Sequence, residues 1–251
     1  MQRGSLVFAK ALATLAVPAG LGLALGLGAC GGGDDGPGDG PFTIDIDNAS
    51  CGDRINFAGE FVDWDNDTRF CGINDALFQV QGDGPQDNTA PNGRFESICI
   101  TDQPTVILDV TPPTGNSVCT VPPSSYPLAG IAVANRDVIR AGAFFSVRSF
   151  TTARRDSFFA QAGFSFAPAL AQVFVHVHGT PRAVSIGAAH APAQAISGTT
   201  WAPGDTGHEV YFPNVDAATG STTLSVAGGA IGTGTIPLAS GKFTYVTVYA
   251  R

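Results

Sequence analysis

The sequence has 251 residues, of which 44% are hydrophobic and only 14% are charged, and it contains 32 glycines and 17 prolines. Its 21 acidic residues outnumber 13 basic ones, for a formal net charge of −8, and such a surface repels phosphate backbones, so nucleic acid is excluded as an expected partner. The glycine and proline content is typical of turn-rich extracellular β proteins, and the length suits one or two small domains.

Residues 1–29 have the features of an export signal peptide. Arg3 and Lys10 supply a basic start, and residues 11–27 form an uncharged run of small and apolar side chains. A permanent membrane span needs about 20 strongly apolar residues, and Pro18 with several glycines weakens a helix in this run. We therefore expect a cleaved leader and not a transmembrane helix.

The segment Leu27-Gly28-Ala29-Cys30 resembles the lipobox of bacterial lipoproteins. The resemblance implies that the Cys30 thiol takes a diacylglycerol in a thioether, that the chain is cut before Cys30, and that the new amino group is acylated. Two or more acyl chains anchor a protein stably, because each buried methylene contributes ~0.8 kcal/mol. Gly31 stands where lipoproteins of the inner membrane often carry Asp, so the expected location is the outer membrane, facing the periplasm or the cell surface. An ordinary secretory leader is the alternative.

Residues 30–41 form a tether that is rich in Gly, Asp and Pro and contains almost nothing to bury. Its root-mean-square reach is about 18 Å, from roughly 5–6 Å times the square root of its length. The expected role of this segment is to hold the rest of the chain away from the bilayer.

After the tether the sequence predicts an all-β fold: two small antiparallel β-sandwich domains joined by one short helix. The first domain spans residues 42–150, the helix or connector residues 151–163, and the second domain residues 164–251. Alternation of apolar and polar residues predicts the strands of the first domain. These strands are expected at residues 55–61, 77–81, 94–100, 106–110, 129–134 and 143–150.

The helix is predicted from a change of period. Phe158, Phe159 and Ala162 recur at helical spacing, Thr152 is a suitable cap, and Gly163 stands where a left-handed terminator belongs. Beyond the helix the alternation of strands resumes. The strands of the second domain are expected at residues 173–178, 183–186, 208–212, 222–226 and 243–249.

Short segments in both halves resemble carboxypeptidase regulatory-like domains, which have a transthyretin-like sandwich fold. In the first half, Asn92-Gly93-Arg94-Phe95 precedes an apolar strand at residues 104–110. In the second half the similar segments are residues 179–186, 211–215 and 220–226. The resemblance implies that the two sandwich domains are transthyretin-like or Ig-like. It also implies a module without catalytic activity, although fold alone does not fix function.

Beyond Cys30 the chain has four cysteines: Cys51, Cys71, Cys99 and Cys119. An even number in an exported chain indicates two disulfides, and none of the spacings is the C-x-x-C of zinc or redox sites. Four cysteines allow three connectivities. The preferred prediction is local pairing, Cys51 with Cys71 and Cys99 with Cys119.

All four histidines lie in the second half of the chain, at His176, His178, His190 and His208. Residues two apart on a strand share a face, so His176 and His178 are candidate ligands for a transition metal, with His190 or His208 as the third. The alternative is that both histidines simply occupy the polar face of a strand whose valines face the core.

A second candidate metal site is acidic. Asp63, Asp65 and Asp67 place carboxylates on alternate residues, and calcium prefers such oxygen ligands. The segment departs from an EF-hand loop, because Thr68 replaces the invariant glycine and Asn74 the bidentate glutamate. An acidic turn after the first strand is the alternative.

Other residues indicate binding only weakly. Trp64 and Trp201 are candidates for stacking on a glycan or for core anchors. Five arginines near the helix are expected to form an exposed rim, with an anionic ligand as the alternative: Arg136, Arg140, Arg148, Arg154 and Arg155.

The sequence contains no H-E-x-x-H, G-x-S-x-G or P-loop motif. We therefore expect no enzymatic activity and no cofactor besides the candidate metals. The expected function is that of a surface lipoprotein acting as a structural or binding module, with the membrane and a protein or glycan as partners. A metal-binding protein and a glycan-binding module are the alternatives.

Overall fold

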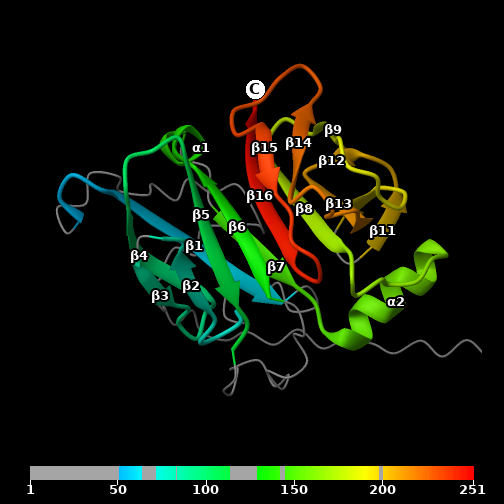
Figure 1. Cartoon of the computed structure of the whole chain (residues 1–251), viewed down its shortest axis with the longest axis horizontal. Helices are drawn as coiled ribbons and strands as arrows, with labels where there is room; N and C mark the ends of the chain where they lie inside the picture. Colours follow the sequence, from blue (N-terminus) through cyan, green and yellow to red (C-terminus); the bar gives the residue numbers. More distant parts are fainter. Residues whose placement is uncertain (1–50, 64–71, 83, 114–128, 142–144, 198–199) are drawn as a thin grey trace, which may run out of the picture. The chain divides into compact units, whose positions relative to one another are not determined.

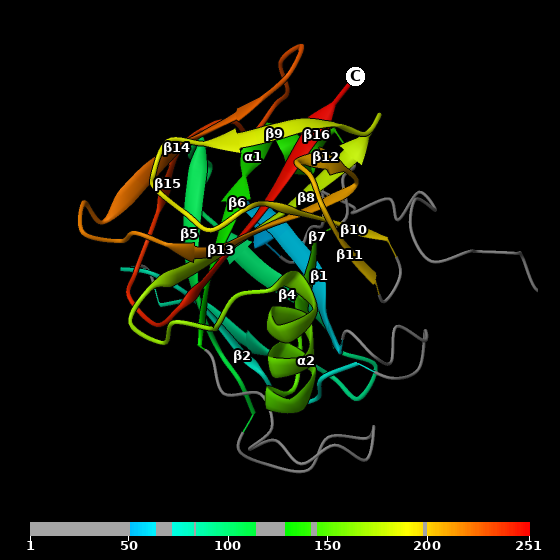
Figure 2. The same cartoon turned by 90° about the vertical axis from the view of Figure 1, so that its right-hand side faces the viewer.

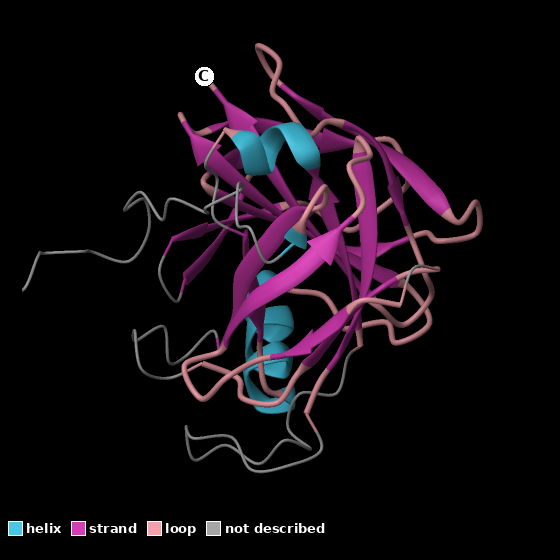
Figure 3. Ribbon diagram, turned by 90° about the vertical axis from the view of Figure 1, so that its left-hand side faces the viewer, coloured by secondary structure: helices cyan, strands magenta, loops and turns pink. Residues whose placement is uncertain are grey.

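The computed structural model describes residues 51–63, 72–82, 84–113, 129–141, 145–197 and 200–251 (Figure 1). These residues all belong to one compact unit, residues 35–251. Strands make up most of the described chain, with two helices among them (Figure 3). The all-β prediction is confirmed. Cys30 and the predicted signal peptide and tether lie outside the described residues.

The largest sheet has nine strands in the order β11-β10-β13-β8-β16-β6-β5-β2-β3. β16 pairs in parallel with both β8 and β6, and the other pairs in this sheet are antiparallel. In the order of the sheet, the strands are β11 (Thr200–Pro203), β10 (Gln194–Ser197), β13 (Glu209–Val215), β8 (Ala171–Gly179), β16 (Phe243–Ala250), β6 (Gly130–Asn135), β5 (Thr105–Thr111), β2 (Leu77–Val80) and β3 (Gln86–Asn88).

This sheet contains strands from both predicted domains. β6 precedes the connector at residues 151–163, whereas β8 and β16 follow it, and the backbone hydrogen bonds between β6 and β16 join the two parts (Figure 1). The predicted boundary at residues 151–163 thus lies between strands of one sheet, and the division into two domains stays a prediction. The parallel pairs differ from the expected antiparallel pattern, because alternation along a strand shows which face is buried and not which direction the neighbouring strand runs.

Two smaller sheets complete the fold. One has the order β4-β1-β7, in which β1 is antiparallel to β4 and parallel to β7. The other has the order β12-β9-β14-β15, and Figure 2 shows β9 crossing the direction of β16. Their strands are β1 (Ile55–Asp63), β4 (Arg94–Ile100), β7 (Phe145–Ser149), β9 (Arg182–Ile186), β12 (Thr206–Gly207), β14 (Ser221–Val226) and β15 (Gly234–Pro237).

The two faces of the nine-stranded sheet bury different cores. On β8, Val173, Val175 and Val177 pack in a cluster that contains Leu224 of the four-stranded sheet. Phe174, which points to the opposite face, belongs to the cluster that contains Phe57 of the three-stranded sheet. The large sheet is therefore covered by the three-stranded sheet on one face and by the four-stranded sheet on the other.

The predicted helix is confirmed as α2 (Thr152–Ala162), with the cap one residue earlier than expected. Thr151 Oγ1 accepts a hydrogen bond from the Arg154 backbone N–H at 3.1 Å, which satisfies one of the free donors of the first turn. Gly163, with φ of 79°, ends the helix as predicted. A shorter helix, α1 (Arg136–Arg140), was not predicted because five residues are too few to show a helical period.

Two tyrosines in the core cluster that contains Phe57 and Phe174 make the stability of the fold depend on pH. Tyr211 and Tyr245 are almost fully buried, and burial raises the pKa of both phenols. A raised pKa in the folded state means that stability is retained below the ordinary pKa of about 10 and is lost as the pH rises through the folded pKa. We expect the free energy of unfolding to fall above about pH 10, with both phenols ionising only as the chain unfolds.

The measurement follows tyrosinate absorbance and circular dichroism together through an alkaline titration. Two of the four tyrosines should ionise in the same transition that abolishes the circular dichroism signal. The variant Tyr211→Phe is the control, since it removes one ionising group and the hydrogen bond of 2.5 Å that Tyr211 donates to Gln172 Oε1. Ionisation of both buried phenols while the dichroism stays native would contradict the prediction.

Candidate functional site

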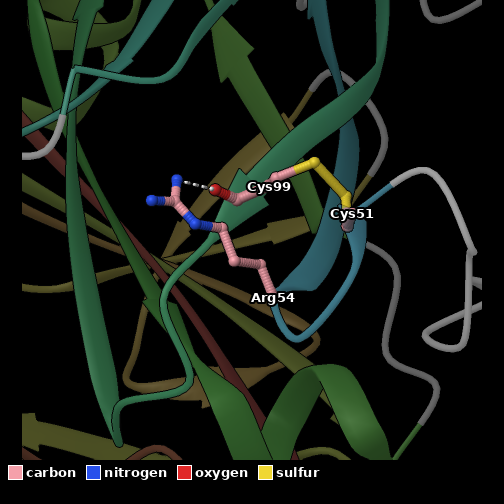
Figure 4. The surroundings of a disulfide bond; sticks show 3 residues. All are labelled: Cys51, Arg54 and Cys99. Carbon is pink, nitrogen blue, oxygen red and sulfur yellow. Dashed lines mark hydrogen bonds between the residues drawn. A yellow bond between two sulfur atoms is a disulfide. The ribbon is translucent and has the colours of Figure 1, made fainter.

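Cys51 is the first described residue, and it follows the predicted tether at residues 30–41 in the sequence. Cys51 forms a disulfide with Cys99, and their Cα atoms are 5.3 Å apart (Figure 4). The Arg54 side chain points at the same strand, and its Nη1 donates to the Cys99 carbonyl oxygen at 3.5 Å. We call Cys51, Arg54 and Cys99 the attachment point.

The attachment point follows from the local sequence. Gly52, with φ of 59°, allows the chain to turn after Cys51, and the Arg54 backbone N–H donates to the Cys51 carbonyl oxygen at 3.1 Å. β1 then begins and pairs with β4 in a register that places Asn56 opposite Cys99. The turn therefore returns Cys51 to the strand that carries Cys99.

The preferred pairing of Cys51 with Cys71 is wrong, because Cys51 is bonded to Cys99. Cys99 is therefore not bonded to Cys119 either, and both Cys71 and Cys119 lie outside the described residues. The reason is geometric: a disulfide needs Cα atoms within about 7 Å, and the antiparallel pairing of β1 with β4 meets this need over a sequence separation of 48. The pairing of the strands, and not the separation of the cysteines in the sequence, therefore decides which cysteines are bonded.

The candidate calcium ligands are only partly described. Asp63 is the last residue of β1, is 1% exposed, and lies opposite Ser149 of β7 in the parallel ladder. Asp65 and Asp67 lie outside the described residues, so the calcium site stays a prediction.

The four histidines have separate surroundings. His176 and His178 share a face of β8 while the intervening valines are buried, as the alternation predicts. Among the described residues, no three His, Cys, Asp or Glu side chains are placed to hold a metal ion. His176 Nδ1 is 3.9 Å from Glu209 Oε1, the His178 ring is 5.2 Å from the Tyr249 ring, His190 Nδ1 is 2.6 Å from the Ala191 carbonyl oxygen, and His208 Nδ1 is 3.1 Å from the Val177 carbonyl oxygen.

A cluster of charged and polar side chains that sequence reasoning missed joins the three-stranded sheet to the large sheet. Arg148 Nε of β7 forms an ion pair of 3.0 Å with Glu209 Oε1 of β13, beside His176 of β8. The Arg148 and Glu209 side chains are only 16% and 12% exposed. Breaking a buried pair by removing one partner is strongly destabilising, so this cluster is a structural link between the sheets. Arg148 was expected in an exposed rim, and no sequence signal connects it to a glutamate so distant along the chain.

Trp201 is a core residue. Its ring stacks on Phe158 of α2 with centroids 4.3 Å apart and an interplanar angle of 18°, and the ring of Tyr211 lies 4.6 Å away. Trp201 is 6% exposed, so the face that a sugar would need is occupied by Phe158. The core-anchor alternative is confirmed for Trp201, whereas Trp64 lies outside the described residues.

No helix in the described part of the chain combines the length and the apolar character needed to cross a membrane.

Comparisons with known proteins assign no family to the chain. No protein-family model matches the sequence, and a search of curated proteins finds no match. Among solved structures, the chain is similar to the Bacillus anthracis TIE protein with 9% sequence identity and a TM-score of 0.21, over 77% of this chain and 34% of that chain. The chain thus spans about a third of that protein, and a likeness at this level carries no argument about fold or function.

Proposed function

We propose that the protein is an exported lipoprotein that is held to a membrane through acylated Cys30 and presents a non-catalytic β body as a structural or binding module. The observation that carries the proposal is the segment Leu27-Gly28-Ala29-Cys30, which stands between the predicted export leader and the predicted tether. Two or more acyl chains on one residue suffice for stable anchoring without any membrane span.

The attachment point supports the proposal. A disulfide such as Cys51–Cys99 persists in oxidising compartments, which include the bacterial periplasm and cell surface, and is rare in the cytosol. It lies at the start of the described body, after the predicted tether. Export and a disulfide at this place are therefore mutually consistent.

The proposal includes a location and a partner class. Gly31 after the lipidated cysteine favours the outer membrane. The body is a module of the carboxypeptidase regulatory-like kind, on the resemblance of residues 179–186 and 220–226, and it binds a protein or glycan outside the cytoplasm.

The test is to express the full chain in a bacterium that processes lipoproteins and to analyse the mature amino terminus by mass spectrometry. We expect a chain that begins at Cys30 and carries a diacylglyceryl thioether and an amide-linked acyl chain. In detergent phase partitioning the wild-type chain should enter the detergent phase, whereas Cys30→Ser should remain uncut and without lipid.

The matched control is Cys51→Ser, which removes a different cysteine and should leave lipidation unchanged. A wild-type chain that begins at another residue and carries no lipid would contradict the proposal, whether or not the β body is folded.

A further inference from the structure

Tension transmitted along the backbone from a membrane anchor at Cys30 reaches the described residues at Cys51, which is the first of them. In a chain without a cross-link, this load would act on the start of β1. β1 is the central strand of the three-stranded sheet, between β4 and β7, and its Phe57 and Phe61 are 0% and 1% exposed in the core. Extraction of β1 would therefore open the core.

The Cys51–Cys99 disulfide changes the path of this load. Force that arrives at Cys51 passes through the sulfur–sulfur bond directly to Cys99, the residue before Ile100 at the end of β4. Residues 52–98 then form a covalent ring that includes all of β1, β2 and β3. Because the ring is closed by a bond and not by backbone hydrogen bonds, tension along the chain does not extend it.

Beyond Cys99 the load follows the chain into the nine-stranded sheet. A short exposed turn leads to β5, which is hydrogen-bonded to β2 on one side and to β6 on the other. Val106, Leu108 and Val110 of β5 are at most 1% exposed. The first strand after the end of β4 that carries the load is thus held by two antiparallel ladders and by the core.

We propose that the Cys51–Cys99 disulfide is a mechanical bypass, which carries force from the membrane anchor past residues 52–98 and delivers it to β5. The force would come from a partner bound to the body while the acyl chains remain in the bilayer. This role deepens the proposed function and rests on it, but the bypass itself is a property of the folded body.

The test is single-molecule force spectroscopy of the full chain, with handles at the amino terminus and at Arg251. Cys30→Ser, Cys71→Ser and Cys119→Ser leave Cys51 and Cys99 as the only cysteines. With the disulfide formed, the contour length released by complete unfolding should be shorter than in the same chain with Cys51→Ser by about 160–170 Å, which is 48 residues at roughly 3.3–3.6 Å each. The first unfolding event should also require a higher force with the disulfide than without it.

The control moves the first handle to Gln103, an exposed residue after the ring. Pulling from this position should give the same contour length and the same first unfolding force with and without Cys51→Ser. Equal contour lengths or equal first unfolding forces in the amino-terminal experiment would overturn the bypass.

A second measurement covers the case in which Cys51→Ser does not fold. The disulfide-bonded chain is unfolded under force, and a dithiol is added, which is oxidised to its cyclic disulfide while Cys51 and Cys99 become thiols. We expect a single further extension of about 160–170 Å, and its absence would contradict the bypass. None of these experiments needs a lipid, so a failure of lipidation and a failure of the bypass are distinguishable.

Discussion

Trp201→Ala is expected to lower the free energy of unfolding by about 3–5 kcal/mol, the range for truncating a large aromatic side chain in a core. Trp201 joins the helix to the sheet, because its ring lies against Phe158 of α2 on one side and Tyr211 of β13 on the other. Phe150, with its centroid 6.2 Å away, completes the contact with the segment between β7 and the helix. Removing the ring leaves a cavity in the contact between α2 and the sheet.

Urea unfolding followed by far-ultraviolet circular dichroism measures this effect. The control is Thr200→Ala on the same strand, whose exposed side chain should change the free energy by no more than about 0.5 kcal/mol. Trp201→Phe should cost less than Trp201→Ala, since Trp201 Nε1 has no hydrogen-bond partner among the described residues and a phenyl ring still fills most of the space. A change below about 1 kcal/mol for Trp201→Ala would contradict a core role, because such values are typical of exposed sites.

Removal of the Cys51–Cys99 disulfide, as Cys51→Ala with Cys99→Ala, is expected to lower the free energy of unfolding by about 2–4 kcal/mol. The bond closes a loop over a sequence separation of 48, and for this length the chain-entropy relation gives about 4 kcal/mol. Most of the effect acts on the unfolded chain, which gains conformations when the ring is opened. The denaturant slope should therefore rise in the double variant, because its unfolded state exposes more surface.

Arg54→Ala is the matched control at the same place. It removes the long, exposed hydrogen bond to the Cys99 carbonyl oxygen but keeps the disulfide, so its effect should remain within about 0.5 kcal/mol. If Arg54→Ala costs as much as the double cysteine variant, local packing and not the covalent ring would account for the stability.

Local features of the fold are predictable from the sequence. The alternation that predicts buried Val173, Val175 and Val177 is present on β8, with the histidines between them on the other face. Helix α2 begins and ends within one or two residues of the predicted positions. The spacing of Phe158 and Phe159 indicates the helical period, and Gly163 indicates where the helix ends.

Long-range features are not predictable in the same way. The parallel pairing of β16 with β6 depends on which strands meet after folding, and no periodicity within either strand encodes it. The ion pair of Arg148 with Glu209 is unpredictable for the same reason. Strands as short as β12, with two residues, give no alternation at all. The candidate site shows the same division: its cysteines could be listed from the sequence, but their pairing could not.

The place of β16 in the nine-stranded sheet has a consequence for the order of folding. β16 is the last described strand in the chain, yet β8 and β6 are hydrogen-bonded to its two sides. The strands before the connector and those after it therefore cannot close into one sheet until residues 243–250 have been delivered. For a chain that is threaded through a membrane from its amino terminus, completion of the sheet must wait until these residues have crossed.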